Sequence, residues 1–315
     1  MDKLIISTSP HIRTKTSVQN IMADVLIALA PAAIAAVVLF GLRALLIMAV
    51  CVASAVLSEF LFNLATKKEQ TIKDLSAAVT GLILALCLPA KAPIWQCVLG
   101  SVFAIVIVKC LFGGIGCNFA NPAATARVFL LVSFSSAIVG GSATVFDGAD
   151  LKASATPLEL IKSASTKDLP SLLDMLLGNR SGAIGETCAI ALIVGGIYLI
   201  VRRVIKWQVP TIYIATVFLL SLAVKQDLTL ALYEVLGGGL IIAAFFMITD
   251  YTSTPINLYG KMVFALGCGI LTVLIRFWGS YPEGVSFAIL IMNIISPYIE
   301  RLCTSKPLGM GGKAE

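Results

Sequence analysis

The chain has 315 residues, of which 58% are hydrophobic and 13% are charged, and its mean hydropathy is +0.97. Soluble domains carry about a quarter charged residues, so this composition excludes a soluble enzyme, a disordered regulator and a nucleic-acid-binding protein. The net charge of +6 is spread between apolar runs, which in a membrane protein reports orientation. The sequence therefore predicts an all-α integral membrane protein.

Ten apolar segments follow one another along the chain. A membrane-spanning helix needs about 20 mostly apolar residues, and several of these segments are shorter. No internal repeat is visible, but two halves of five spans would be inverted relative to each other, as in many transporters. We expect one polytopic domain, residues 1–315, with spans at residues 21–40, 44–64, 75–90, 94–112, 123–139, 185–201, 209–224, 231–249, 262–278 and 284–300.

The positive charges orient these spans. Clusters of lysine and arginine at residues 3–15, 67–73 and 202–206 all fall on the same side as the N-terminus, whereas the short gaps on the other side hold single charges. The positive-inside rule then places both termini in the cytoplasm. It also places residues 140–184, the only sizeable polar loop, outside the cytoplasm. Loops of this length are usually functional or disordered.

The first interruption of the apolar pattern is the segment Gly113–Pro122, which reads Gly-Gly-Ile-Gly-Cys-Asn-Phe-Ala-Asn-Pro. Non-helical backbone at membrane depth must line a cavity or be buried in protein. The side-chain amides of Asn118 and Asn121 could bond a planar heterocycle. The alternative is a re-entrant turn that satisfies its own backbone. The glycines do not predict a nucleotide-binding fold, because no strand–helix alternation surrounds them.

The long polar loop contains the segment Asp150-Leu-Lys-Ala-Ser-Ala-Thr156-Pro157. Small residues before Thr156 would leave its hydroxyl accessible to a modifying enzyme, and Pro157 keeps the residue before it extended. From chemistry alone, the segment is a solvated loop with a helix N-cap.

A second glycine-rich segment, Gly178–Thr187, leads into the sixth span. Arg180 could meet a phosphate or a flavin carbonyl, because its guanidinium presents a fork of donors. Glu186 lies at the expected membrane edge, where its alternative role is to cap the N-terminus of the following helix.

Acidic residues in or beside the spans are the candidates for ion coupling, since an ionisable group in a membrane is costly enough to suggest function. Asp250, in the segment Phe246–Pro255 that closes the eighth span, lies at a predicted cytoplasmic end, where solvation lowers that cost. The ion-coupling candidates are Glu186, Asp250, Asp74 and Glu300, and Asp24, Glu59 and Glu234 also fall within or beside spans.

We expect no protein-bound metal. The chain has a single histidine, His11, and no CxxC pair among its eight cysteines. Most of these cysteines lie in apolar runs, where cysteine behaves as a small hydrophobic residue. A bis-histidine haem is therefore excluded within the chain, and the spacing of iron–sulfur ligands is also missing.

Taken together and in order, these segments resemble the flavin-carrying membrane subunit family shared by the Rnf and Na⁺-NQR redox pumps. The resemblance covers nearly the whole chain, and the length is similar to that of the D subunit of the Rnf complex. The homologous B subunit of the Na⁺-NQR complex has a longer N-terminal region. The strongest markers are Gly113-Gly114-x-Gly116-x-Asn118-Phe119-x-Asn121-Pro122, Gly182-x-x-Gly185-Glu186 and Met247-x-Thr249-Asp250.

In that family a threonine of the extracytoplasmic loop carries FMN through a phosphoester bond, which a flavin transferase forms from FAD. The resemblance implies that Thr156 carries covalent FMN in this chain. Asp150, Ala155 and Thr156 match the transferase motif, whereas Ala153 replaces its usual hydroxyl residue and Ser154 its glycine.

The family also implies a noncovalent riboflavin in the membrane, which we carry over to Asn118, Asn121 and Pro122. The expected role is electron relay within an ion-translocating oxidoreductase of the prokaryotic cytoplasmic (inner) membrane, which passes electrons from reduced ferredoxin to NAD⁺ and exports Na⁺ or H⁺. The chain would not be catalytic alone. It has no dinucleotide fingerprint, so ferredoxin and NAD⁺ must bind other Rnf subunits of the complex.

Two other functions stay open at this point. The chain could be the B subunit-like component of a Na⁺-translocating NADH:quinone reductase. It could also be a secondary transporter or channel without redox function, built from two inverted halves.

Overall fold

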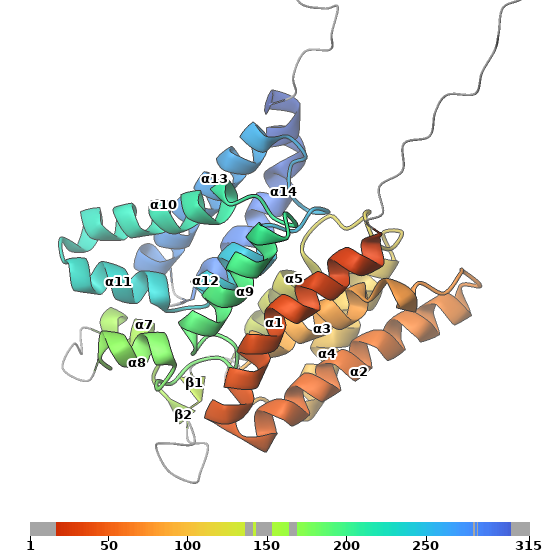
Figure 1. The fold of residues 1–315 in the computed structure, drawn as a ribbon, viewed down its shortest axis with the longest axis horizontal. Helices are drawn as coiled ribbons and strands as arrows, with labels where there is room; N and C mark the ends of the chain where they lie inside the picture. The colour runs from red at the N-terminus through yellow and green to blue at the C-terminus, as the bar shows by residue number, and fades with distance from the viewer. Residues whose placement is uncertain are drawn as a thin grey trace, which may run out of the picture.

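A computed structural model describes residues 17–135, 141–142, 153–163, 169–279, 281 and 283–303, with residues 141–142 and 153–154 described by their backbone alone. Most of these residues are helical, and they include one antiparallel ladder of two-residue strands (Figure 1). The main elements in chain order are α1 (Val18–Phe40), α2 (Leu42–Ala65), η1 (Ile72–Asp74), α3 (Ser76–Leu86), α4 (Ile94–Val102), the π-helical η2 (Phe103–Cys110), α5 (Pro122–Ser133), β1 (Gly141–Ser142), β2 (Ala153–Ser154), α7 (Pro157–Lys162), α8 (Leu172–Leu177), α9 (Ala189–Val201), α10 (Gln208–Lys225), α11 (Leu228–Leu236), α12 (Leu240–Ile242), the π-helical η5 (Ala243–Met247), α13 (Leu258–Trp278) and α14 (Val285–Cys303).

The predicted all-helical architecture is confirmed, and each of the ten predicted segments contains a helix. Five helices, α1, α2, α10, α13 and α14, are long and apolar enough to cross a membrane. A sixth candidate span is α11 joined to α12–η5, which bends by 61° at the junction. The helices α3, α4–η2, α5 and α9 are apolar but shorter, at 10–17 residues. Length and composition therefore support five or six spans among the described residues, and ten spans stay a prediction.

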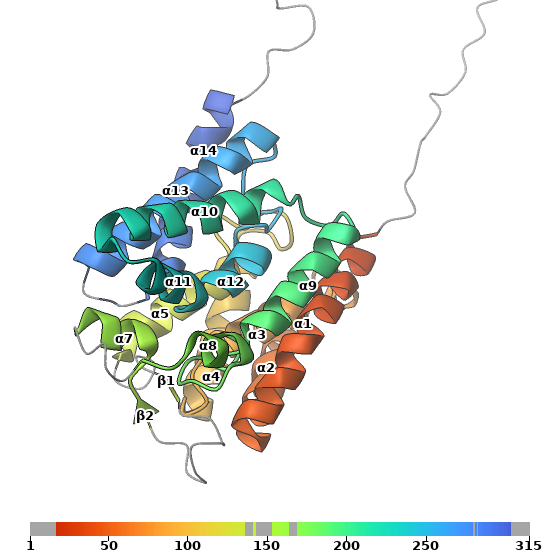
Figure 2. The same cartoon turned by 60° about the vertical axis from the view of Figure 1, so that its left-hand side comes forward.

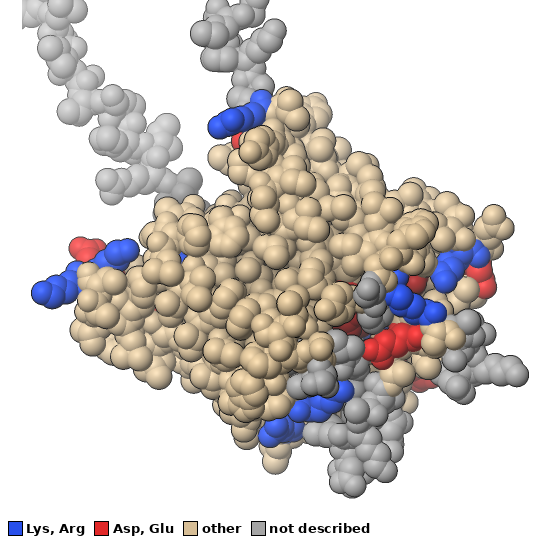
Figure 3. Space-filling model, turned by 180° about the vertical axis from the view of Figure 1, so that it is seen from behind, with Lys and Arg blue, Asp and Glu red and all other residues tan. Residues whose placement is uncertain are grey.

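The outer surface suits a lipid environment. Figure 3 shows a broad uncharged surface on one face, with lysine, arginine, aspartate and glutamate side chains near its edges. Large apolar side chains such as Ile34, Leu57 and Leu219 are more than half exposed on the long helices. Exposed apolar side chains of this size are expected where the solvent is the bilayer core.

Small residues let the helices approach closely. α1 packs along α9, α2 along α3 and α4, and α10 along α13 (Figures 1 and 2). A Cβ at Gly81 of α3 would lie 2.7 Å from the Cys51 carbonyl oxygen of α2, and Gly195 of α9 lies directly against the Ala28 carbonyl of α1. Close backbone approach at small residues is the usual way in which membrane helices gain packing energy.

The third predicted span, residues 75–90, is shorter than expected because its last residues leave the helix. The backbone N–H groups of Ile184 and Gly185 donate to the carbonyls of Leu88 and Leu86, at 2.9 and 2.7 Å. This strand-like pairing ends α3 and also delays the start of α9 to Ala189. Both predicted boundaries were wrong because a contact between distant segments replaced the helical hydrogen bonds.

The eighth predicted span is broken in its middle. Three consecutive glycines, Gly237–Gly239, separate α11 from α12, and Gly238 and Gly239 adopt φ values of +64° and +67°. Glycine reaches this left-handed region without steric cost. The break leaves backbone groups without helical partners, so other side chains must supply them.

The described part of the long polar loop lies at one end of the molecule. In Figure 1, α7, α8 and the strand ladder lie at the bottom, whereas α1 begins and α14 ends toward the top. The loop and the two described chain ends therefore lie on opposite sides of the helical body.

Candidate functional site

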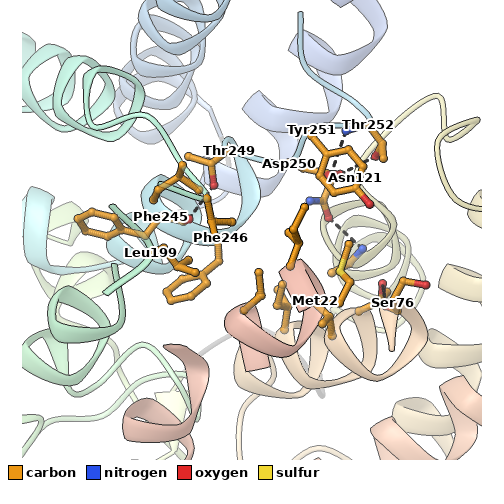
Figure 4. Close-up of a pocket in the computed structure, with 18 of the residues that line it drawn as sticks. Met22, Ser76, Asn121, Leu199, Phe245, Phe246, Thr249, Asp250, Tyr251 and Thr252 are labelled. Atoms are coloured by element: carbon orange, nitrogen blue, oxygen red, sulfur yellow. Dashed lines mark hydrogen bonds between the residues drawn. The ribbon is translucent and has the colours of Figure 1, made fainter. Parts of the chain in front are cut away.

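A cavity of about 310 Å³ lies at the end of the molecule where α1 begins and α14 ends. Figure 4 shows that one side of it carries Leu199, Phe245 and Phe246 and the other carries polar side chains, including Asn121 and Asp250. Pro122, Lys109, Asn118, Arg203, Lys206 and Lys261 also line it. Since Arg203 and Lys206 are exposed, the cavity reaches the surface.

The structure brings Asn118 and Asn121 to this cavity but uses them differently. The Asn121 Oδ1 accepts from the backbone N–H groups of Ala123 and Ala124, both at 3.1 Å, and thereby caps α5. Its Nδ2 donates to the Met247 carbonyl at 3.3 Å. Asn118 Oδ1, in contrast, is buried and has no hydrogen-bond partner. Asn121 therefore positions the wall, and Asn118 is the side chain with an acceptor left for a ligand.

Lys109 is a cavity residue that sequence reasoning missed. Its ammonium donates to Glu59 Oε1 and to Ser76 Oγ, each at 2.7 Å. Lys109 and Glu59 are each 2% exposed. The signal was present in the sequence, because a lysine within the predicted span 94–112 is as costly as the acidic residues that were noted.

Asp250 lies in the turn that follows η5 and also lines the cavity. Its carboxylate accepts hydrogen bonds from the Thr252 N–H, the Thr252 hydroxyl and the Ser253 hydroxyl, at 3.0–3.2 Å. Burial raises the pKa of the Asp250 carboxyl, and these hydrogen bonds oppose the shift. The turn therefore presents a carboxyl group to the cavity within a fixed polar frame.

Thr156 lies at the other end of the molecule and caps α7. Its hydroxyl accepts from the Glu159 N–H at 3.3 Å, and its own N–H donates to Glu159 Oε2 at 2.8 Å, which completes a capping box. The predicted N-cap is confirmed. The expected accessible hydroxyl is wrong for this structure, because Thr156 is 2% exposed. Pro157 and Leu158 are buried beside it, so the helix start is packed against the protein.

The remaining residues of the proposed transferase motif are only partly described. Ser154 belongs to β2, which pairs with β1, and the Ala155 carbonyl accepts a hydrogen bond from Ser181. Asp150 lies outside the described residues.

Arg180 is buried and bonds the protein backbone. The residue is 3% exposed, and its guanidinium donates to the carbonyls of Leu236 and Glu186, at 2.8 and 2.9 Å. Glu186 does not cap α9, because its Oε1 accepts from the Gly238 N–H at 2.5 Å. Both side chains therefore bond the backbone around the Gly237–Gly239 break, and Arg180 Nε and Glu186 Oε2 are left buried without a partner.

Arg276 also stabilises the backbone around the Gly237–Gly239 break. Its guanidinium donates to the Glu234 carbonyl at 2.5 Å, to Glu234 Oε2 at 3.1 Å, and to the carbonyls of Gly237 and Gly238, at 3.1 and 3.4 Å. Three arginine–glutamate pairs of low exposure join this region: Arg127–Glu283, Arg180–Glu186 and Arg276–Glu234.

Among the other acidic candidates, Glu300 and Asp24 have structural partners, and the candidates do not meet in one place. Glu300 accepts from the Ile256 N–H at 2.7 Å. Asp24 pairs with Arg202 at 3.2 Å and accepts from the Tyr198 hydroxyl at 3.0 Å. Asp74 ends η1 and does not line the cavity. Within the described ranges, no three histidine, cysteine, aspartate or glutamate side chains gather in a way that could hold a metal ion.

Known proteins resemble this chain over almost its full length. Residues 5–309 match the model of the NQR2, RnfD, RnfE family. The chain is 46% identical to the D subunit of the Na(+)-translocating ferredoxin:NAD(+) oxidoreductase complex of Acetobacterium woodii, over 98% of this chain and 96% of that protein. It is 40% identical to the D subunit of the proton-translocating ferredoxin:NAD(+) oxidoreductase complex of Clostridium ljungdahlii, over 97% and 96%. It is 30% identical to the D subunit of the ion-translocating oxidoreductase complex of Methanosarcina acetivorans, over 98% of each chain.

Proposed function

The chain belongs to the NQR2, RnfD, RnfE family, and on that basis we propose that it is the flavin-carrying membrane subunit of an ion-translocating ferredoxin:NAD⁺ oxidoreductase. The observation that carries the proposal is the convergence of family markers on one cavity. Asn118 and Asn121 come from one marker and Thr249 and Asp250 from another, far along the chain, and all four line it. Other subunits would bind ferredoxin and NAD⁺.

We place a noncovalent riboflavin in this cavity. Ligand cavities measure roughly 300–1,000 Å³, and the observed volume of about 310 Å³ suits a planar ring system. Phe245 and Phe246 supply an aromatic wall, and the unpartnered Asn118 Oδ1 supplies an acceptor for a ring N–H. A bound flavin would contribute electron transfer, singly or in pairs. The protein contributes orientation through Asn118 and exclusion of water through the two phenylalanines.

The test for this site replaces Asn118 with Leu. The variant should lose acid-extractable flavin, because the only assigned acceptor for the ring is removed. A matched control is Asn63→Leu, since the Asn63 amide bonds Thr71 and does not line the cavity. Unchanged extractable flavin in the Asn118 variant would show that the site lies elsewhere.

We further propose that Thr156 carries covalent FMN. The motif match at Asp150, Ala155 and Thr156 supports this, as does the position of Thr156 at the end opposite to the cavity. Because the hydroxyl is buried in the capping box, the flavin transferase must act while the first turn of α7 is open.

Coexpression of the chain with a flavin transferase tests this assignment. The purified chain should give a fluorescent band in a denaturing gel, and Thr156→Ala should abolish it. Ser171→Ala is the matched control, because Ser171 caps α8 in the same loop and its loss should leave the band intact. Persistent fluorescence in the Thr156 variant would contradict the assignment.

The finer topology also belongs to this proposal. Ten spans in two inverted halves with cytoplasmic termini would put Thr156 outside and the cavity at the cytoplasmic side. The π-helical stretches η2 and η5 support a related plan in the two halves, since each is followed by a polar turn that reaches the cavity. Alkaline phosphatase fusions should be active after residue 165 and inactive after residue 303.

The two other functions make different predictions. A Na⁺-NQR-type complex would co-purify with a quinone-reducing assembly, and a transporter without redox function would carry solute as the isolated chain and hold no flavin. The exported ion can be decided by measuring transport in membrane vesicles, because the relatives include Na⁺- and proton-translocating complexes.

A further inference from the structure

The cavity wall contains a buried positive charge that the proposed function has not used. Lys109 lies in the π-helical η2 and lines the cavity together with Ser76, to which its ammonium donates. Ser76 lies on the polar side of the cavity with Asn121 (Figure 4). The ammonium is therefore beside the wall that would face the polar edge of a bound ring.

The partner of Lys109 lies behind it. Glu59 pairs with the ammonium but does not line the cavity. Glu59 Oε1 also accepts from the Thr71 hydroxyl at 2.6 Å, which holds the carboxylate on the far side. Within this pair, the Lys109 ammonium therefore lies nearer to the cavity than the Glu59 carboxylate does. An ammonium has three N–H donors, and the hydrogen bonds to Glu59 and Ser76 occupy two of them.

Water screens the other charges that line the cavity more strongly than it screens Lys109. Arg203 and Lys206 are exposed, and Lys261 and Asp250 are partly exposed. Lys109 is 2% exposed. Charges act more strongly where protein replaces water, because the effective dielectric constant falls from about 80 toward 20 or less. Among the charged side chains known to line the cavity, Lys109 is thus the one whose field water weakens least.

We propose that Lys109 raises the reduction potential of a flavin in this cavity. The inference rests on the proposed function, which supplies the flavin. When an iron–sulfur centre of the complex gives up one electron to the flavin and no proton follows, the flavin gains one negative charge. A fixed ammonium nearby favours that reduced form, and charge close to the ring is a recognised way in which proteins tune flavins. Glu59 and Ser76 hold the Lys109 ammonium in place, so Lys109 acts on the flavin through its fixed charge and takes no part in the electron transfer itself.

The experiment uses the full chain in lipid nanodiscs with Thr156→Ala, so that covalent flavin does not contribute. Flavin content is measured by extraction, and the midpoint potential by a redox titration followed by absorbance. Lys109→Met should shift the midpoint to more negative values. Lys109→Arg, which keeps the charge, should stay close to the parent. Lys225 lies at the C-terminal end of α10 and does not line the cavity, so Lys225→Met should leave the midpoint potential unchanged.

A further variant guards against loss of folding. Removing one member of a buried ion pair is strongly destabilising, whereas replacing both is often tolerated. Glu59→Gln with Lys109→Met should therefore hold flavin and shift the midpoint in the same direction, but less. The proposal is overturned if the Lys109→Met or double variant binds flavin with an unchanged midpoint, or if Lys225→Met shifts it equally. A parent chain without extractable flavin would instead overturn the proposed riboflavin site.

Discussion

Replacement of Arg276 with Met should destabilise the protein more than any change at an exposed ion pair. The Arg276 guanidinium supports one carboxylate and three backbone carbonyls around the Gly237–Gly239 break. Loss of one partner from a buried pair costs about 3–5 kcal/mol. Each buried carbonyl left without a donor adds about 1–3 kcal/mol, although carbonyls that regain water or shift will recover part of this. We therefore expect a loss of roughly 4–6 kcal/mol, from the pair and at least one carbonyl.

The assay is equilibrium unfolding in mixed detergent micelles, followed by tryptophan fluorescence. Arg202→Met is the matched control, because Arg202 pairs with Asp24 but its side chain is 55% exposed. An exposed pair contributes about 0–1 kcal/mol. Equal losses in the two variants would refute the argument that Arg276 holds the break. Glu234→Gln should fall between them, because the amide oxygen can still accept from Arg276.

Three further outcomes are expected. Gly185→Val should cost about 1–3 kcal/mol through overpacking, measured by the same unfolding assay, because a Cβ there would lie 2.5 Å from the Leu86 Cβ. Glu159→Ala should weaken the capping box by about 0.5–2 kcal/mol and thereby speed flavin attachment at Thr156 in a time course of gel fluorescence, whereas a slower reaction would argue against an opening step. Since burial raises the pKa of Asp250, its carboxyl favours folding when protonated, and this contribution is lost as pH rises through the folded-state pKa. Asp250→Asn should therefore gain stability relative to the parent as pH rises above about 4, the ordinary range of an aspartate carboxyl, and a constant difference would contradict the shift.

The positions of the helices could be predicted from the sequence because apolar run length is a local property. Helices appear in all ten predicted segments, and the N-cap at Thr156 is also local, since Pro157 and Glu159 lie beside it. The ends of α3 and α9 could not be predicted in this way. These ends depend on hydrogen bonds between residues 86–88 and 184–185. The spacing of apolar residues along the sequence does not predict such contacts between distant segments.

The sequence predicted some of the residues that reach the site, but not the contacts that each of them makes there. The marker residues Asn118 and Asn121 do reach one cavity, but their different roles depend on what faces each amide. Arg180 was noted as a possible partner of a phosphate or a flavin, and its hydrogen bond to the Leu236 carbonyl is a contact that the sequence does not show. A charged side chain in an apolar chain signals that a partner exists, and the partner becomes known only when the helices are placed in space.

The Gly237–Gly239 break also constrains how the protein is made. Its carbonyls and the Glu234 carboxylate depend on Arg276, and Arg127 depends on Glu283, so the needed partners are synthesised after the break itself. While the ribosome is still upstream of residue 276, the α11–α12 segment carries polar groups that the nascent chain cannot yet satisfy. Translation products that stop before that point therefore lack the donors that these polar groups need.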